Sequence, residues 1–325
     1  MQIKSVADAD VAGKRVLVRV DFNVPIEGGK VVEDMRIRAA IPTIELLHQK
    51  GASQITLITH IGRPEGKVVE ELRVAPVEAR LRELTQAPFV MEENLRFNPG
   101  EEANDPAFAQ QLASFGDIFV NDAFAVSHRA DASVVGVPKL LPSYAGLLME
   151  KEVHMLSHAL VPPPGAIAIL GGAKLETKLP LIEKFAALYS KVLVGGAIAN
   201  EYASHEARPQ NVLLPQDGIP QLAGMFDIGT QTREGWVREI AAAPFVLWNG
   251  PVGMYEKPEF AQGTDALASA LVGSSAAAVI GGGDTAAAIA KFTFDPARIF
   301  ISTGGGAMLE FLIAGTLPGI EALKK

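Results

Sequence analysis

The sequence predicts an α/β fold made of two doubly wound parallel-sheet domains joined by a helix. Three observations favour this fold. Short runs rich in Val and Ile recur along the 325 residues, as expected for strands buried on both faces of a parallel sheet. Each run ends in turn residues and precedes a helix-like pattern, which is typical of βαβ units. Residues 161–165 (VPPPG) cannot continue a helix and therefore divide the chain into two halves.

The expected elements follow one another in a regular order. In the first half the predicted strands are Arg15–Val20, Gln54–Thr59 and Asp117–Val120. In the second half they are Ala166–Leu170, Lys191–Val194, Phe245–Trp248, Ala277–Ile280 and Arg298–Ser302. Helical patterns lie between them at Ala39–Gln49, Val77–Leu84, Pro106–Leu112 and Pro180–Leu188, with a further helix, Met149–Leu160, at the boundary.

Composition excludes several classes of function. The formal net charge of −8 argues against a nucleic-acid partner and against an anionic membrane surface. The absence of cysteine excludes disulfides, a thiol nucleophile and Cys-ligated zinc. The first residues contain no apolar core of a signal peptide, and no apolar stretch approaches the roughly 18 residues of a membrane span. A cytoplasmic protein is therefore expected.

Polar and cationic residues stand at the predicted strand ends of the first half, where open α/β sheets bind ligands. A single arginine there would more often be an ordinary surface ion pair. Several together indicate an anion site, because the planar guanidinium binds carboxylate or phosphate through two hydrogen bonds. The residues concerned are Asp21, Phe22, Asn23, Arg36, His60, Ile61, Gly62, Arg63, Arg96, Asn121, Asp122, His128 and Arg129.

Glycines follow the predicted strands of the second half, at Gly171–Gly172, Gly195–Gly196, Gly250, Gly281–Gly283 and Gly304–Gly306. One pair alone would more often be a simple turn. Five junctions favour a nucleotide site, because glycine admits a close ligand and the next helix offers N–H donors to phosphate. Neither a Walker A loop nor a dinucleotide fingerprint occurs.

Two further features of this half concern phosphate chemistry. Lys174 and Lys178 are four residues apart and would share one face of a first helical turn, either against phosphates or as a solvated pair. Asp284 begins a glycine-rich helix, so it is either a magnesium ligand or an ordinary N-cap.

Many longer motifs resemble those of phosphoglycerate kinases and occur in the family's order over nearly the whole chain. They include VDFNVP, DMRIRAAIPTI, THIGRPEGK, ENLRFNPGEE, VNDAFAVSHRADAS, ILGGAKLETK, VGGAIAN, WNGPVGMYE, IGGGDTAAA and STGGGAMLEFLIAGTLPGI. The resemblance implies a glycolytic phosphotransferase that transfers a phosphoryl group reversibly between 1,3-bisphosphoglycerate and ADP, giving 3-phosphoglycerate and ATP with Mg²⁺. It further implies two Rossmann-like domains, a hinge helix whose bending closes them, and a cytoplasmic monomer without nucleic-acid or membrane partners.

The resemblance also assigns domains and residues. It implies a 3-phosphoglycerate domain over residues 1–152, a nucleotide domain over 153–303, and a segment over 304–325 that packs back on the first domain. The implied substrate residues are Asp21, Phe22, Asn23, Arg36, His60, Ile61, Gly62, Arg63, Arg96 and Arg129. The implied nucleotide residues are Gly172, Lys174, Lys178, Gly196, Asn249, Pro251, Glu256, Gly282, Gly283, Asp284 and Thr285, with Asp284 also at the metal. Arg36, Lys174 and Lys178 are the implied catalytic residues.

The sequence departs from the family pattern at four places. Residues are missing before Glu93, where a helix and a strand are expected, and between Asn200 and Asp227. Asp131 replaces a histidine and would repel phosphate unless it pairs with an arginine or points away. Gln231 replaces a lysine. These departures keep two alternatives open: a binding protein without nucleotide affinity, and a kinase for another phosphorylated acid.

Overall fold

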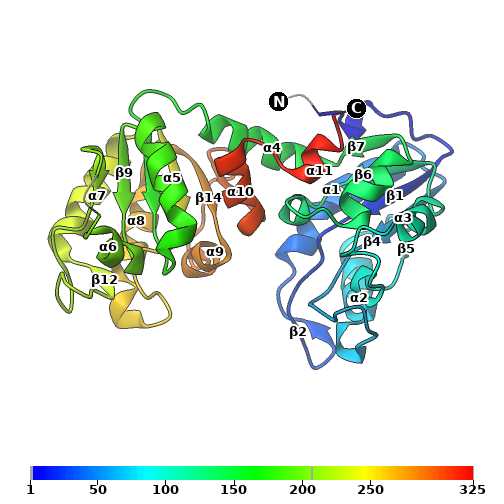
Figure 1. Cartoon of the computed structure of the whole chain (residues 1–325), viewed down its shortest axis with the longest axis horizontal. Helices are drawn as coiled ribbons and strands as arrows, with labels where there is room; N and C mark the ends of the chain where they lie inside the picture. Colours follow the sequence, from blue (N-terminus) through cyan, green and yellow to red (C-terminus); the bar gives the residue numbers. More distant parts are fainter. Residues whose placement is uncertain (1–2, 206–207, 325) are drawn as a thin grey trace. The chain divides into compact units, whose positions relative to one another are not determined.

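The computed structural model describes residues 3–205 and 208–324. The chain forms two compact units, and each is described by itself (Figure 1). Unit 1 comprises Met1–His154 and Thr316–Lys325, and unit 2 comprises Met155–Gly315. The chain passes from one unit to the other within α4 (Leu147–Ala159), and the following prolines end this helix as expected.

Unit 1 contains a five-stranded parallel sheet in the order β5-β4-β1-β6-β7. Its strands are β1 (Arg15–Arg19), β4 (Gln54–Ile58), β5 (Val90–Met91), β6 (Ile118–Asn121) and β7 (Ser143–Ala145). A small antiparallel pair, β2 (Ile26–Glu27) and β3 (Lys30–Val31), precedes the first helix. The α-helices are α1 (Met35–Gln49), α2 (Ala75–Leu84), α3 (Pro106–Ala113), the first part of α4, and α11 (Pro318–Glu321).

Both faces of this sheet are covered. Val16 and Val18 of β1 pack in one apolar cluster with α1 and α2. Leu17, which points to the other face, packs with α3 and with the π-helical turn η5 (Ala132–Gly136). This alternation along one strand is the period of two expected for a strand between two helical layers.

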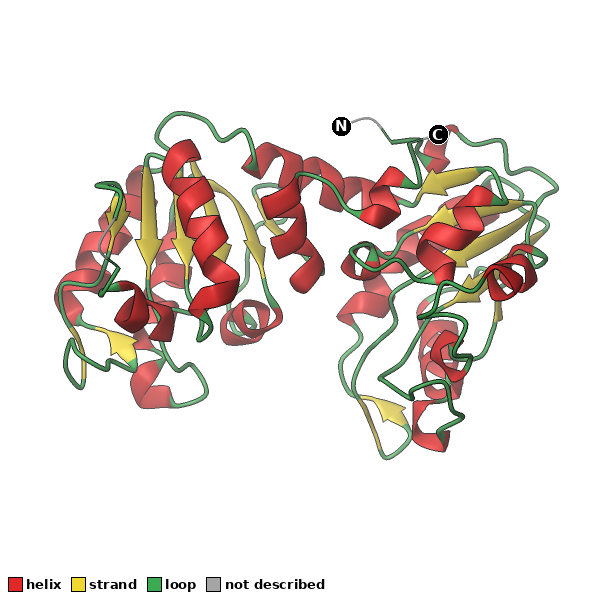
Figure 2. Cartoon of the chain, viewed as in Figure 1, coloured by secondary structure: helices red, strands yellow, loops and turns green. Residues whose placement is uncertain are grey.

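Unit 2 contains a six-stranded parallel sheet in the order β10-β9-β8-β13-β14-β15 (Figure 2). Its strands are β8 (Ile167–Leu170), β9 (Lys191–Val194), β10 (Val212–Leu213), β13 (Phe245–Asn249), β14 (Ala277–Gly281) and β15 (Ile299–Ile301). The strands β11 (Gly218–Ile219) and β12 (Asp227–Ile228) form a separate antiparallel pair. The helices are α5 (Leu175–Leu188), α6 (Ala197–Tyr202), α7 (Thr230–Ala242), α8 (Gln262–Gly273), α9 (Gly283–Ile289) and α10 (Gly306–Ala314).

Helices α7 and α8 cover one face of this second sheet, where Trp236 and Leu267 pack against Trp248. Helices α5 and α10 contact each other, and Lys184 of α5 donates from Nζ to the carbonyl of Ile313 at 3.0 Å. The predicted α/β class with two parallel sheets is therefore confirmed. Within the described residues no helix is both long and apolar enough to cross a membrane.

The structure differs from the expected boundaries in the last part of the chain. Residues 304–315, expected with the first domain, lie in unit 2 because α10 packs on α5. Of this last part of the chain, only residues 316–325 belong to unit 1. There Gly319 donates its N–H to the carbonyl of Ser127 at 2.8 Å. The first boundary lies at His154, two residues beyond the expected position.

Candidate active site

The loops that follow β1 and β4 are hydrogen-bonded to each other at the carboxyl edge of the unit 1 sheet. Gly62 donates its N–H to Oδ1 of Asn23 at 2.9 Å, and Phe22 donates its N–H to Oγ1 of Thr59 at 3.0 Å. The two strands are parallel and adjacent, so their carboxyl ends meet at this edge. The residues predicted from the two strand ends therefore lie together.

The segment after β5 joins this edge through Asn94, which is buried. Nδ2 of Asn94 donates to the carbonyl of Ile61 at 2.8 Å, and its Oδ1 accepts from the N–H of Arg96 at 3.1 Å. The guanidinium of Arg96 donates to the carbonyl of Gly62 at 2.8 Å. The segment after β5 thus places Arg96 beside the loops that follow β1 and β4.

Arginine–carboxylate pairs organise the charges here. Arg36 donates to Oδ2 of Asp21 at 2.6 Å, and this carboxylate is buried. Glu102 accepts from Arg129 at 2.7 Å and lies 3.4 Å from Nε of Arg96. The arginines are therefore held in place and partly neutralised before any anion binds.

Asp131, the residue that departs from the family pattern, is buried and pairs with an arginine. Its Oδ2 accepts from Nε of Arg129 at 2.8 Å. Asp131 therefore pairs with an arginine, which the sequence required if its negative charge was not to repel a bound phosphate. It also reduces the positive charge that Arg129 presents to an anion.

His60 lies among the arginines and is 3% exposed. Burial, and then the charges of Arg19, Arg96, Arg129 and Arg36, hold the pKa of His60 well below its usual value. His60 is consequently neutral at pH 7. Arg63 differs from its predicted neighbours, since it is exposed and makes no side-chain hydrogen bond or ion pair within the described residues.

The glycine junctions of unit 2 pack against one another. A Cβ atom on Gly171 would lie 2.2 Å from the carbonyl oxygen of Pro251, and one on Gly250 would lie 2.2 Å from that of Gly171. A Cβ atom on Gly196 would lie 2.9 Å from the backbone of Gly172. Close packing of loops therefore explains three of the glycines. A Cβ atom on Gly172 or Gly283 would meet nothing within 4 Å, so these two positions face open space.

Lys178 is the buried cation of unit 2. Its ammonium donates to Oδ1 of Asn249, whose Nδ2 donates to the carbonyl of Gly281 at 2.9 Å. Burial lowers the pKa of Lys178 to about 8, and the charge of Asp284 partly opposes this shift. Thr285 completes the group, because its hydroxyl accepts from the N–H of Gly250 at 2.7 Å. Asn249, Gly250, Gly281 and Lys178 are thereby brought together.

Of the remaining predicted nucleotide residues, Pro251 is buried, whereas Lys174, Glu256, Gly283 and Asp284 are exposed. Asp284 lies in the first turn of α9, whose N-cap is Gly282, so the alternative of an N-cap role for Asp284 is excluded. Lys174 precedes α5 with an extended backbone, whereas Lys178 lies inside the helix. The two lysines therefore do not share a helical turn.

Sequence reasoning missed three polar residues beneath the anion site: Arg19, Glu101 and Ser133, all of them buried. The only available signal was an arginine within the apolar run RVLVRV. The other two carry no local pattern, since Ser133 contacts Arg19 across 114 residues of sequence.

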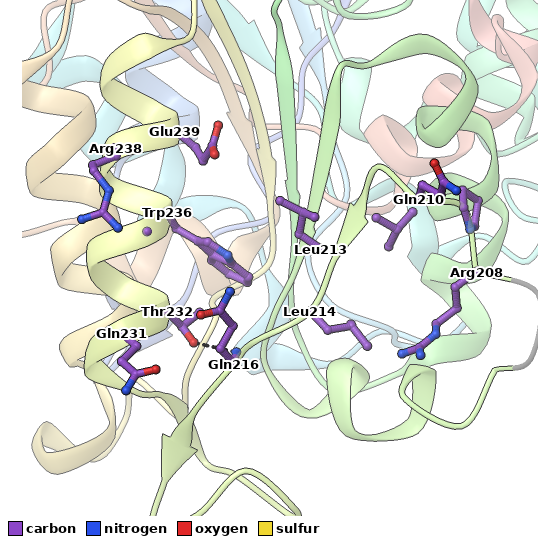
Figure 3. Close-up of a pocket in the computed structure, with 13 residues that line it drawn as sticks. Arg208, Gln210, Leu213, Leu214, Gln216, Gln231, Thr232, Trp236, Arg238 and Glu239 are labelled. Atoms are coloured by element: carbon purple, nitrogen blue, oxygen red, sulfur yellow. Dashed lines mark hydrogen bonds between the residues drawn. The ribbon is translucent and has the colours of Figure 1, made fainter.

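A groove of about 530 Å³ beside the edge strand β10 was also not predicted from the sequence (Figure 3). Leu213 and Leu214 line one side of the groove, and Trp236 lines it from α7. The hydroxyl of Thr232 accepts from the N–H of Gln216 at 2.9 Å across its floor. Gln231, a departure from the family pattern, also lines it.

Comparisons with known proteins agree with this geometry. The family model described as phosphoglycerate kinase matches residues 6–91, 84–208 and 201–315. The phosphoglycerate kinases of Herpetosiphon aurantiacus and Thermomicrobium roseum are 40% and 39% identical to this chain, and the alignments cover 99% of each chain. The solved phosphoglycerate kinase of Coxiella burnetii superposes with a TM-score of 0.88 at 33% identity and 99% coverage of both chains.

The comparisons also locate the missing residues. The alignment with the Herpetosiphon protein spans 392 positions, whereas this chain has 325 residues. The family match is divided into pieces that overlap at residues 84–91, next to the first short segment, and at residues 201–208, within the second. In the first segment β5 leads directly to Leu95, and no helix or strand intervenes. With both sheets present and the match extending over the whole chain, the protein belongs to the phosphoglycerate kinase family.

Proposed function

We propose that this chain transfers a phosphoryl group reversibly between 1,3-bisphosphoglycerate and ADP, with the phosphoglycerate held by unit 1 and the nucleotide by unit 2. The observation that carries the proposal is the group of arginines around neutral His60 at the carboxyl edge of the unit 1 sheet. Such a group suits a small substrate with both a carboxylate and a phosphate.

Unit 1 supplies binding and charge neutralisation in this proposal. The substrate residues are Asp21, Phe22, Asn23, Arg36, His60, Ile61, Gly62, Arg63, Arg96 and Arg129. The acceptor carboxylate is already ionised at neutral pH, so the reaction needs no general base. Arg36 is 31% exposed while Asp21 orients it, so the rest of its guanidinium is free to neutralise the transferring phosphoryl group.

Unit 2 supplies the nucleotide site. Lys178, held by Asn249, remains largely protonated at pH 7 and would contact a nucleotide phosphate. Gly282 is the N-cap of α9, Gly283 and Thr285 lie in its first turn, and a Cβ atom on Gly283 would meet nothing within 4 Å, which leaves room for a phosphate. In this proposal Glu256 contacts the ribose and Lys174 contacts the phosphoryl group that is transferred. The nucleotide site also includes Gly172, Gly196 and Pro251.

The residues present suit magnesium. The described residues contain no group of three or more carboxylate or histidine ligands, and Asp284 offers a single exposed carboxylate. Mg²⁺ is commonly bound by one or two carboxylates together with substrate phosphates. An ion held by Asp284 and the nucleotide phosphates would neutralise charge on the phosphoryl group.

Catalysis in this proposal also requires α4 to act as a hinge, because acceptor and donor are held by different units. Small-angle scattering tests this part. We expect the radius of gyration to fall when 3-phosphoglycerate and a non-hydrolysable ATP analogue are added together, but not with either alone. An unchanged radius would contradict hinge closure.

The activity itself is tested by ATP formation from 1,3-bisphosphoglycerate and ADP at millimolar Mg²⁺. We expect turnover by the wild-type protein and a loss of kcat of about 100-fold or more in Arg36→Ala and Lys174→Ala. Arg38→Ala, on the same helix as Arg36 but paired with Asp34, is the matched control and should retain activity. Absence of turnover with every purine nucleotide would overturn the proposal.

Calorimetry with ADP separates a kinase from a protein that binds only the anion. We expect ADP to bind, and to bind more weakly to Lys178→Met. A chain that binds 3-phosphoglycerate but not ADP would instead be a binding protein. A monomer in the cytoplasm stays a prediction, which sedimentation and cell fractionation would test.

A further inference from the structure

Arg19 is a buried cation at the end of β1, and it is 1% exposed. Its Nε donates to Oγ of Ser133 at 2.9 Å, and one terminal nitrogen lies 3.2 Å from Nδ1 of His60. A charge in such a position is stable only if it is paired and hydrogen-bonded. The contacts of Arg19 therefore reveal how its orientation is set.

A buried carboxylate orients the guanidinium through Ser133. Glu101 accepts from the N–H of Ser133 at 3.0 Å and from its hydroxyl at 2.5 Å. The single proton of the Ser133 hydroxyl is used in the hydrogen bond to Glu101, so the hydroxyl oxygen is free to accept a hydrogen bond from Arg19. Arg19 thus donates on two sides, to Nδ1 of His60 and to Oγ of Ser133, and Ser133 donates in turn to Glu101.

The contact with His60 determines where the proton of its ring lies. A guanidinium has five N–H donors and no acceptor, so Nδ1 of His60 must accept. A neutral ring that accepts at Nδ1 carries its proton at Nε2. A doubly protonated ring would place two N–H groups against each other.

The charged groups around His60 act in the same direction. Arg19, Arg96, Arg129 and Arg36 face it from β1, the segment after β5, the segment after β6 and α1. Carboxylates lie nearby, but Asp21 pairs with Arg36, Asp131 with Arg129, and Glu102 with Arg96 and Arg129. No hydrogen bond joins Nε2 of His60 to the residues that the structure describes.

We propose that Arg19 is a positioning residue that holds His60 as the neutral Nε2–H tautomer and so presents a hydrogen-bond donor, not a second cation, to the substrate anion. The nature of that anion rests on the proposed function, whereas the tautomer does not. The anion site thus gains a neutral hydrogen-bond donor in place of a further positive charge.

The tautomer is measured by two-bond ¹H–¹⁵N correlation spectra of ¹⁵N-histidine-labelled protein without substrate. The signals of His60 are those lost in His60→Gln. We expect an unprotonated Nδ1 and a protonated Nε2 at pH 7. An Nδ1–H ring, or a charged ring at pH 7, would overturn the proposal whether or not the protein is active.

Substitutions separate positioning from a purely structural role. In Arg19→Lys the shorter donor should release Nδ1, so that His60 titrates at higher pH and the KM for 3-phosphoglycerate rises about threefold or more with little change in kcat. Arg15→Lys is the matched control, since Arg15 lies on the same strand and, among the described residues, its side chain bonds to Asp117 and to the carbonyl of Ser114. An unchanged tautomer and KM in Arg19→Lys would show that Arg19 only supports the fold.

A second pair of variants leaves Arg19 in place, so this test does not require that the protein folds after Arg19 is replaced. The amide of His60→Gln supplies a neutral donor near the position of Nε2, whereas His60→Ala supplies none. We expect KM to rise less in His60→Gln than in His60→Ala, by roughly threefold or more between them. Equal losses in both variants would indicate that His60 binds as a cation.

Discussion

Asp131 shows how one substitution changes the charge of a binding site while the local geometry is kept. Its carboxylate is 5% exposed and pairs with Arg129, which is 34% exposed and also bonded to Glu102. Arg129 is therefore matched by two carboxylates. The anion site consequently carries less net positive charge than its number of arginines suggests.

Asp131→Asn should strengthen substrate binding. The amide keeps the shape of the side chain and removes one negative charge beside Arg129, whose 34% exposure limits the gain to roughly 0.5–1 kcal/mol. We expect the KM for 3-phosphoglycerate to fall about two- to fivefold, most clearly at low salt. Steady-state kinetics at two ionic strengths check this, with exposed Asp10→Asn as control. A higher KM would contradict it.

Asp122 makes stability depend on pH. It is fully buried, its Oδ1 accepts the N–H groups of Leu148 and Met149 at the start of α4, and burial raises its pKa to about 7. Between about pH 4 and pH 7 the folded protein holds a proton that the unfolded chain has released. The free energy of unfolding should therefore fall as pH rises through this window.

Asp122→Asn should remove much of that pH dependence, by up to a few kcal/mol between pH 5 and pH 8. Urea unfolding at both pH values measures it. Asp227, whose pKa burial raises to about 6, contributes in the same direction and keeps part of the slope. Asp117→Asn is the control, because its bond to Arg15 lowers the pKa and gives the opposite sign. An unchanged slope in Asp122→Asn would refute this account.

The turns after β8 and β13 depend on each other because their backbones touch. Gly171→Ala would place a Cβ atom 2.2 Å from a backbone oxygen, and backbone cannot move aside cheaply. We expect a loss of several kcal/mol in stability together with weaker ADP binding. Gly273→Ala, at the end of α8 with nothing within 4 Å of its Cβ, should be neutral or slightly stabilising. Thermal unfolding and calorimetry compare the two.

The strands predicted from the sequence are buried along most or all of their length, as β4 and β13 are. Strands β5, β7 and β10 have only two or three residues, and their neighbours in the sheet define them more than their own residues do. Helix α5 begins at Leu175 and not at the expected Pro180, which lies inside the helix and removes one of its backbone hydrogen bonds.

The residues of the candidate site could be predicted from the sequence where they directly follow a strand. His60 and Asn23 are of this kind, since local order places them there. The buried layer below was not predictable, because Ser133 reaches Arg19 through the folding of η5 and not through any nearby pattern.

The molecule as a whole is two units joined twice by the chain, and residues 316–325 complete unit 1. Leu317, Ile320 and Leu323 are each at most 2% exposed. This last segment therefore contributes to the stability of unit 1, although it follows all of unit 2 in sequence.

Ile320→Ala should lower the stability of unit 1 by about 2–5 kcal/mol, because it leaves a cavity among buried residues. Ile313→Ala, at a 40% exposed position in α10 of unit 2, is the matched control and should cost much less. Differential scanning calorimetry reports both. Equal shifts of the unfolding temperature would argue against this role of Ile320.

The double crossing of the chain has a consequence for biosynthesis. The ribosome makes the strands of unit 1 first, but it must make all of unit 2 before the segment that carries Ile320 emerges. Until then unit 1 lacks the segment that contacts Ser127 and Val134. The unit whose synthesis begins first is therefore completed last.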